Sequence, residues 1–260
     1  MKPYVSKGHT LKNLRKYVRL SQDVDGWFNI ESAAVWASLL ELQNQRKIHG
    51  DFLEIGVFKG KSAILSSLYA RENERCVFVD PVVTNEAKSA VMSVRKSNNI
   101  FIEALSGTIQ NDARLYEKGT EAYRWIHVDG EHTQEQVIGD LQIAEKLLHK
   151  TGIIAIDDFF SANYPQVTSG VFQFLEQARG RFSMFLCGYN KGYLARPVAS
   201  LIYLEHIAKQ MMADFKSVGL NTVSLAKTTH PQDMNCFGLV SRWSGRDYVG
   251  PAWNADLISY

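Results

Sequence analysis

Three aspartates that follow apolar runs form the most distinctive chemical pattern in the sequence. Asp129 ends the run RWIHVD, and Asp157 and Asp158 end the run IIAIDD. If these runs are neighbouring parallel strands, which lie about 4.8 Å apart, the three carboxylates converge and repel one another unless a cation lies between them. Oxygen-only ligands favour Mg²⁺, with Mn²⁺ or Ca²⁺ as alternatives. We therefore expect Asp129, Asp157 and Asp158 to be metal ligands. The alternative is that one Asp caps a helix or loop and another is solvated.

A histidine accompanies the first of these acids. His132 follows Asp129 by three residues, so it leaves the same strand end. Imidazole has an ordinary pKa of about 6.5, which suits a general base near neutral pH. We expect His132 to be the catalytic base and Asp129 to act with it through the metal; otherwise His132 is a polar surface residue or a helix N-terminal partner. His127 lies mid-strand, and we expect a packed core residue that points to the opposite face from Asp129.

A glycine-containing turn, FLEIGVFKGKS, follows the first apolar run and could hold either of two kinds of ligand. The residues Gly60-Lys61-Ser62 resemble the end of a phosphate-binding P-loop. A P-loop has four residues between its glycines, whereas three separate Gly56 from Gly60. Glu54 would also repel a polyphosphate from this strand end. The turn is therefore a poor P-loop, and we expect Lys61 to be a solvated residue of a first helical turn.

The same turn suits S-adenosylmethionine (SAM), which carries a sulfonium and an amino group but no phosphate. Glu54 could accept a hydrogen bond from the amino-acid part of SAM, and Gly56 and Gly60 would let the backbone approach the ligand. Asp80 ends the next apolar run, where an acid binds the ribose hydroxyls of an adenosine. A dinucleotide enzyme would want the same acid but also the spacing G-x-G-x-x-G. The predicted cofactor contacts are Glu54, Gly56, Gly60, Ser62, Asp80, Ser106, Gly107 and Asp129, with Ser106 and Gly107 lining the adenine pocket.

Apolar runs alternate with helical patterns over residues 51–158, which predicts an α/β fold. We expect a Rossmann-like, doubly wound, mostly parallel sheet, whose ligands bind beyond the carboxyl ends of the strands. The segment FSMFLCGYNKGYLARP predicts an antiparallel hairpin at the sheet edge, turning at residues 190–192, and the helical pattern TQEQVIGDLQIAEKLLHKTG ends at its final glycine. We divide the chain, as one domain, into an N-terminal helical arm or lid (1–50), a SAM-binding core (51–197) and a C-terminal extension (198–260).

Composition argues against several classes of function. The 260 residues include 29 basic and 27 acidic ones, and the net charge of +2 indicates neither a nucleic-acid nor a membrane partner. The chain has no apolar stretch of about 18 residues and no signal-peptide pattern. Three scattered cysteines are typical of a reduced, cytoplasmic protein. We expect a small-molecule acceptor, and an aromatic content of 11% favours an uncharged, ring-shaped one. Candidate residues for a lid over this acceptor are Trp27, Phe28, Phe159, Phe160 and Tyr164, and the aromatic tail (Trp243, Tyr248, Trp253, Tyr260) is a candidate lid or homo-oligomer interface.

The segments VDGEHTQEQVIGDL and GIIAIDDF are similar to the pattern of macrocin-type and related sugar O-methyltransferases, D-G-x-H-x-Y followed by a D-D pair. Residues 51–160 as a whole resemble a class I SAM-dependent methyltransferase, methyltransferase-family-24-like. The resemblance implies a Rossmann-like fold, SAM as methyl donor, Mg²⁺ bound by the three acids at positions 129, 157 and 158, and His132 as base. The chain departs from this family at Gln134, where the family has an aromatic residue.

Two other functions remain as alternatives. A SAM- or nucleotide-binding protein without transfer activity would explain the turn but would leave the acids and His132 without a use. In a P-loop-like nucleotide hydrolase, IIAIDD would be the apolar strand and the Asp that holds Mg²⁺, but the glycine spacing of the turn and Glu54 argue against this enzyme. A metal-dependent hydroxylase would need a second histidine to complete a set of two histidines and one carboxylate. His127 is the nearest candidate, and the orientation we expect for it argues against this enzyme class.

Overall fold

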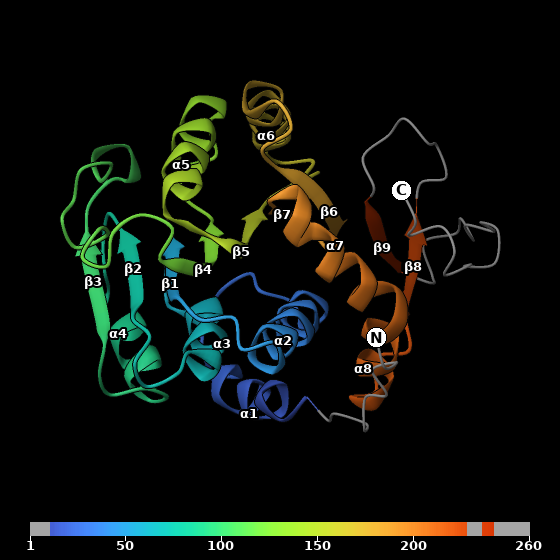
Figure 1. The fold of residues 1–260 in the computed structure, drawn as a ribbon. Helices are drawn as coiled ribbons and strands as arrows, with labels where there is room; N and C mark the ends of the chain where they lie inside the picture. The colour runs from blue at the N-terminus through green and yellow to red at the C-terminus, as the bar shows by residue number, and fades with distance from the viewer. Residues whose placement is uncertain (1–10, 228–235, 242–260) are drawn as a thin grey trace.

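The computed structural model describes residues 11–227 and 236–241 (Figure 1). Within these residues, nine strands form one sheet in the order β3-β2-β1-β4-β5-β7-β6-β9-β8. The first five strands in this order are parallel, and β7 is antiparallel to both β5 and β6. The strands are β1 (Asp51–Ile55), β2 (Cys76–Asp80), β3 (Asn99–Glu103), β4 (Tyr123–Val128), β5 (Leu148–Asp157), β6 (Ser183–Gly188), β7 (Lys191–Ala195), β8 (Val223–Lys227) and β9 (Phe237–Ser241).

Helices cover both faces of this sheet, as Figure 1 shows. One apolar cluster joins α5 and α6 to one face, and a second cluster joins the N-terminal helices, α3, α4 and the helices after β7 to the other face. Because parallel strands buried on both faces carry apolar side chains on both sides, the strands read as continuous apolar runs. The helices are α1 (Lys12–Ser21), α2 (Ile30–Gln45), α3 (Lys61–Tyr69), α4 (Asn85–Met92), α5 (Gln134–Leu147), α6 (Pro165–Ala178), α7 (Pro197–His206) and α8 (Met212–Ser217), with the short 3₁₀ helix η1 (Ser106–Thr108) and a π-helical turn η2 (Ile207–Met211).

The predicted Rossmann-like, mostly parallel sheet is confirmed, but two local boundaries differ from the prediction. The hairpin between β6 and β7 turns at Tyr189 and Asn190, whose φ angles are 53° and 64°, rather than at residues 190–192. Two consecutive positive φ angles are typical of the tight turn that joins antiparallel strands. Gly192 therefore lies inside β7, where a Cβ atom would come 3.0 Å from the ring of Phe159. This shift also places Lys191 in a strand instead of a turn.

The second difference concerns the end of α5. The helix ends at Leu147, and β5 begins at Leu148, whereas the sequence pattern predicts a helix up to Gly152. Leu148 pairs with Tyr123 of β4, and the register then shifts before the pairing continues at Ile153. This early pairing with the neighbouring strand converts the last predicted helical turn into strand.

The C-terminal part of the chain extends the sheet. β9 runs parallel to β6 beyond the predicted hairpin, and β8 pairs antiparallel with β9 at the sheet edge. The hairpin is therefore followed by two further strands in the sheet order. The aromatic residues Trp243, Tyr248, Trp253 and Tyr260 lie outside the described residues. Among the helices that the structure describes, no candidate combines the length and apolar character needed to cross a membrane.

Candidate active site

A cavity of about 600 Å³ lies where β1, β2, β4 and β5 reach their carboxyl ends. Its volume is within the range of about 300–1,000 Å³ that is typical of small-molecule sites. Seven of the predicted site residues are on its wall: Gly56, Ser62, Asp80, Asp129, His132, Asp157 and Asp158. Four other predicted residues are not among those that line it: Glu54, Gly60, Ser106 and Gly107.

The turn after β1 is organised around Asp80. One carboxylate oxygen of Asp80 accepts hydrogen bonds from the backbone N–H groups of Val57 and Phe58, at 2.8 and 2.9 Å. A phosphate cradle would need these same N–H groups to point at the ligand. Because they point at a carboxylate, the turn is not the phosphate cradle of a P-loop. Asp80 itself lines the cavity, and its other oxygen, which accepts the backbone N–H of Val82 at 2.9 Å, has a lone pair for one further hydrogen bond.

Gly56 brings this turn against the end of β4. Its φ angle is +86°, and a Cβ atom at this position would lie 1.7 Å from the backbone oxygen of Asp129. The N–H of Asp129 donates to the carbonyl of Ile55, 2.8 Å away. The absence of a side chain at Gly56 therefore allows the chain itself to approach, and in this way Gly56 positions Asp129. Gly60 is the N-cap residue of α3 and has a φ of +83°. A Cβ atom at Gly60 would lie 3.2 Å from the backbone of Ala87. Cofactor contacts from both glycines stay predictions.

Replacing Gly56 by Ala is expected to destabilise the fold by at least about 2 kcal/mol, because a left-handed backbone costs an alanine about 1–2 kcal/mol and the new methyl group also meets a carbonyl. Urea unfolding measures this loss. Gly119 is the matched control, since its φ is +83° and nothing lies within 4 Å of its Cβ position. An equal loss in Gly56→Ala and Gly119→Ala would show that the contact with Asp129 is unimportant.

Glu54 lies behind the cavity wall rather than on it. Its side chain is 2% exposed, and one oxygen, Oε1, accepts a hydrogen bond from the Ser62 hydroxyl. The same oxygen lies 3.2 Å from Nδ1 of His127. The other oxygen has no hydrogen-bond partner within the described residues. Glu54 therefore orients Ser62 and His127 in this structure, and its contact with the amino-acid part of SAM, directly or through water, stays a prediction.

Ser106 and Gly107, predicted to line the adenine pocket, belong to η1 and face α5. The Ser106 hydroxyl is hydrogen-bonded to Asp140, and a Cβ at Gly107 would come 2.9 Å from the side-chain oxygen of Gln136. Their contact with adenine stays a prediction. Burial raises the pKa of Asp140 to about 6, although hydrogen bonds from Gln136 and Ser106 oppose this rise.

The raised pKa of Asp140 predicts a pH-dependent cost to stability. Since the folded protein holds the Asp140 proton more tightly than the unfolded chain, stability falls as pH rises from the ordinary Asp pKa of 3.8 to about 6, and stays lower above that. Asp140→Asn is therefore expected to stabilise the protein by about 2 kcal/mol at pH 7.5 and by little at pH 4. Urea unfolding at the two pH values tests this. The change Asp23→Asn, at an exposed position, is the control. An Asp140→Asn effect that is equal at both pH values would contradict the prediction.

Asp157 and Asp158 each have partners from the β6–β7 hairpin. Asp157 forms an ion pair with Lys191, and its Oδ1 accepts the backbone N–H of Asp158 at 2.8 Å. Asp158 accepts a hydrogen bond from the side-chain amide of Asn190 at 2.6 Å, and its other oxygen lies 2.8 Å from Nε2 of His132. The two neighbouring carboxylates therefore point toward different partners.

Asp129 differs from these two acids because its carboxylate makes no hydrogen bond to the described residues. It belongs to two groups of donor atoms, each with all atoms within 4.8 Å of one another: one with His127 and Asp157, the other with His132 and Asp158. Burial and the nearby Asp157 carboxylate raise the pKa of Asp129 well above its usual range, and Lys191 opposes this. Burial alone would also raise the pKa of Asp157, but Lys191 and His127 outweigh it and the pKa is lowered. An unpartnered carboxylate beside other acids fits a cation.

Residues 53–159 match the family described as a methyltransferase domain. The O-methyltransferase NovP has a similar structure, with a TM-score of 0.56 and 14% identity over 65% of this chain and 80% of NovP. CalS11, a TDP-rhamnose 3′-O-methyltransferase of calicheamicin biosynthesis, also has a similar structure. Its TM-score is 0.51 and its sequence identity is 13%, over 74% of this chain and 96% of CalS11. MycE of the mycinamycin pathway was solved with Mg and S-adenosylhomocysteine (SAH). Its TM-score is 0.53 and its sequence identity is 13%, over 73% of this chain and 55% of MycE. At these identities the three structures establish a shared fold. No curated protein sequence matches the chain significantly.

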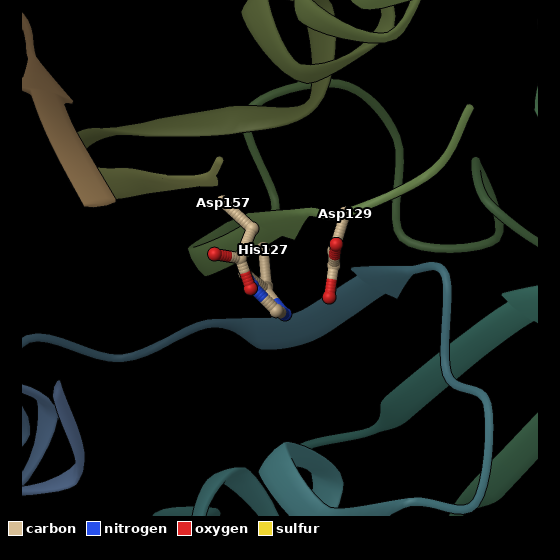
Figure 2. A group of neighbouring side chains, drawn as sticks. All are labelled: His127, Asp129 and Asp157. Carbon is tan, nitrogen blue, oxygen red and sulfur yellow. The ribbon is translucent and has the colours of Figure 1, made fainter. Parts of the chain in front are cut away.

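Two residues beside the acid cluster were missed by the sequence prediction. His127 does not point away from Asp129: Figure 2 shows His127, Asp129 and Asp157 together at the ends of β4 and β5. The prediction of opposite faces was wrong, because residues two apart on a strand share a face, and this rule alone could have found His127. Lys191 is 2% exposed and pairs in register with Asp157. It could have been found only with the correct turn of the hairpin.

Aromatic side chains line part of the cavity. The ring of Tyr164 stacks on His132 at 3.9 Å, and Trp27, which is 89% exposed, stacks on Phe58 at 5.3 Å. Trp27, Phe28 and Tyr164 line the cavity, as expected of lid residues. Phe159 and Phe160 are not among the lining residues, and Phe159 is buried in the core.

Proposed function

We propose that the protein is a SAM-dependent O-methyltransferase that methylates a hydroxyl group of a small molecule. The observation that carries this proposal is one cavity that joins the Asp80 turn to the acids after β4 and β5 and to His132. The fold shared with NovP, CalS11 and MycE supports it, since all three are named as methyltransferases and MycE was solved with SAH and Mg. A sugar or another ring-shaped natural product is the acceptor class that we propose.

The cavity fits SAM. Asp80 is on the wall with a lone pair that could accept a ribose hydroxyl, and the turn of Gly56 lies beside it. Bound SAM would supply an electrophilic methyl group. The partly exposed aromatic residues around the mouth, Trp27 and Tyr164, would exclude water and hold the acceptor ring against this group. The contribution of the chain is mainly to position the acceptor hydroxyl.

His132 is the proposed general base. With Nε2–H donating to Asp158, the lone pair on Nδ1 is available to accept the proton of the acceptor hydroxyl. The stacked ring of Tyr164 fixes the plane of the imidazole. A Mg²⁺ ion held by Asp129, Asp157 and Asp158 would lower the pKa of that hydroxyl. The unpartnered Asp129 carboxylate is the feature that suits such an ion, because Asp157 already forms an ion pair with Lys191.

The remaining proposals concern the protein as a whole. We propose the cytoplasm as its location, which agrees with the three free cysteines. We propose that residues 1–50 act as an arm or lid, residues 51–197 as the SAM-binding core and residues 198–260 as an extension of a single domain. A homo-oligomer, and the absence of nucleic-acid and membrane partners, stay predictions.

The first test is calorimetric titration with SAH and with ATP–Mg²⁺, each with and without EDTA. Micromolar SAH binding without ATP–Mg²⁺ binding is the expected result. Asp80→Asn should weaken SAH binding at least about tenfold, since a hydrogen bond to a charged group contributes about 1.5–3 kcal/mol. The control Asp112→Asn should not change it. Binding of ATP–Mg²⁺ instead of SAH would exclude the methyltransferase.

Transfer is tested separately from binding. Radiolabelled SAM and a panel of sugars, catechols and polyketides with adjacent hydroxyl groups would be incubated with the protein and Mg²⁺. The expected result is labelled product that depends on His132. SAH binding without transfer to any acceptor in the panel, together with unchanged SAH affinity in His132→Asn, favours the alternative of a binding protein without transfer activity.

A further inference from the structure

The buried side of the acid cluster offers a nitrogen donor that an all-oxygen magnesium site lacks. His127 is 1% exposed, and its Nε2 has no hydrogen-bond partner within the described residues. Nε2 lies 3.9 Å from Oδ2 of Asp157, and His127, Asp129 and Asp157 each offer one donor atom within 4.8 Å of those of the other two. We propose that His127 is a ligand of a divalent transition-metal ion, together with Asp129 and Asp157. This inference rests on the proposed metal-dependent methyl transfer, and it replaces Asp158 by His127 in the proposed ligand set of that site.

The other side of the imidazole is prepared for this role. Nδ1 of His127 lies 3.2 Å from Oε1 of Glu54, a carboxylate that is buried next to it. A proton on Nδ1 satisfies this contact and leaves a lone pair on Nε2, the nitrogen that lies 3.9 Å from Asp157. Metal-bound histidines usually donate their second ring N–H to a carboxylate, which fixes the tautomer and raises the basicity of the ligand nitrogen. In this proposal Glu54, which lies behind the cavity wall, fixes the tautomer of His127.

The spacing of the three donors suits a small ion. A ligand set at about 2.0–2.2 Å from an octahedral ion has donor atoms about 3 Å apart in adjacent positions and about 4.3 Å apart in opposite ones. The separation of 3.9 Å between Nε2 of His127 and Oδ2 of Asp157 lies between these values. The donors come from the ends of the adjacent strands β4 and β5. The edge-on ring of Trp36, 4.6 Å from the imidazole, limits its rotation.

The second donor group, with His132 and Asp158, is less suited to the ion. Nε2 of His132 already contacts Oδ2 of Asp158 at 2.8 Å, so its lone pair is not directed into the group when it donates there. His132 is also the proposed base. In this proposal the buried His127 binds the ion, and the half-exposed His132 accepts the proton of the acceptor hydroxyl.

A nitrogen ligand changes which ions the site prefers. Mg²⁺ selects oxygen ligands, whereas imidazole suits later first-row ions such as Fe²⁺, Ni²⁺ and Zn²⁺, and the affinity of a mixed nitrogen and oxygen site rises from Mn²⁺ to Co²⁺. The ammonium of Lys191 shares Asp157 with the ion and lowers its affinity for every divalent ion. We expect the chelator-treated protein to bind Mn²⁺ and Co²⁺ at least about tenfold more tightly than Mg²⁺.

The decisive experiment is pulsed electron paramagnetic resonance of the chelator-treated protein loaded with Mn²⁺ alone. Modulation of the spin echo by a directly bound ¹⁴N atom is expected in the wild type and in His132→Asn. It should be lost in His127→Asn. Asparagine at this position keeps an N–H group near Nδ1 for Glu54 and removes the atom that corresponds to Nε2, so the variant is matched to the question.

The outcomes separate this inference from the proposed function. No ¹⁴N coupling in the wild type, or coupling that survives in His127→Asn and disappears in His132→Asn, overturns the inference. If His127→Asn does not fold, coupling in both the wild type and His132→Asn still supports it, and its absence from either one overturns it. SAH titration accompanies each sample: SAH binding without a nitrogen-bound ion rejects the His127 ligand only, whereas loss of both rejects the methyltransferase as well.

Discussion

Asp129→Asn is expected to abolish divalent-ion binding and methyl transfer and to stabilise the ion-free protein. Asp129 belongs to both groups of potential ligands, so its loss affects the ion wherever it binds. The affinity for Mn²⁺ should fall at least about a hundredfold, and transfer to any acceptor of the wild type at least about a thousandfold, because metal-assisted ionisation of the hydroxyl is lost. The stability should move in the opposite direction.

The gain in stability follows from the sign of the pKa shift. Burial and Asp157 raise the pKa of Asp129. The folded protein therefore holds this proton more tightly than the unfolded chain does, and stability falls as pH rises from the ordinary Asp pKa through the raised one. Asparagine removes this cost at neutral pH and breaks no hydrogen bond within the described residues. Urea unfolding in EDTA at pH 7.5 should show a more stable variant.

Asp157→Asn is the matched control for Asp129→Asn, because it should have the opposite effect on stability. Asp157 has a lowered pKa, held down by Lys191 and His127 despite its burial. Its charge therefore contributes stability that is present at neutral pH and lost as pH falls through the lowered pKa. Asp157→Asn is expected to destabilise the ion-free protein. If both variants lose stability, the unpartnered state of Asp129 is not a feature of the protein in solution.

The parallel half of the fold could be predicted from sequence because each of its strands is coded locally. Strands such as CVFVD are apolar on both faces and are followed by helical patterns, which is a feature of parallel sheets. The acids at positions 80, 129 and 157 share one edge because parallel strands all end on the same side. Their common location in one cavity therefore follows from the sheet direction and requires no long-range information.

The features that local sequence does not predict depend on contacts between distant segments. Gly56 is explained by the backbone oxygen of Asp129, which is 73 positions away along the chain. The N–H groups of Val57 and Phe58 point at Asp80, which no local pattern indicates. The hairpin turn uses Tyr189 and Asn190 at positive φ, although a glycine lies nearby at 192. The orientation of His127 was predictable, by contrast, from the two-residue repeat of a strand.

The β6–β7 hairpin places Lys191 beside Asp157, and replacement of this lysine is expected to have a large effect on stability. Lys191→Met is expected to destabilise the ion-free protein by about 3–5 kcal/mol, the usual cost of leaving one member of a buried ion pair without its partner. Lys191 is 2% exposed and pairs with Asp157, whose side chain is 12% exposed. Methionine keeps the length and the apolar contact with Phe28, over whose ring the ammonium now lies at 5.2 Å.

Mn²⁺ should restore most of the stability lost in Lys191→Met. An ion bound by Asp157 supplies the positive charge that the ammonium gave, and the repulsion between ion and ammonium disappears. Urea unfolding with EDTA and with Mn²⁺ is therefore expected to show a larger ion effect in the variant than in the wild type, and Mn²⁺ should bind the variant at least about tenfold more tightly.

Lys118→Met is the control for the removal of a lysine that pairs with a buried aspartate. Its ammonium lies 2.8 Å from the buried Asp51, and neither residue lines the cavity. Its loss should be insensitive to Mn²⁺. Equal stabilisation of the wild type and Lys191→Met by Mn²⁺ would mean that the ion does not share Asp157 with Lys191. In the expected case, Lys191 is the cation that keeps the acid cluster folded before an ion arrives, and the affinity of the site for metal is set by competition between the two.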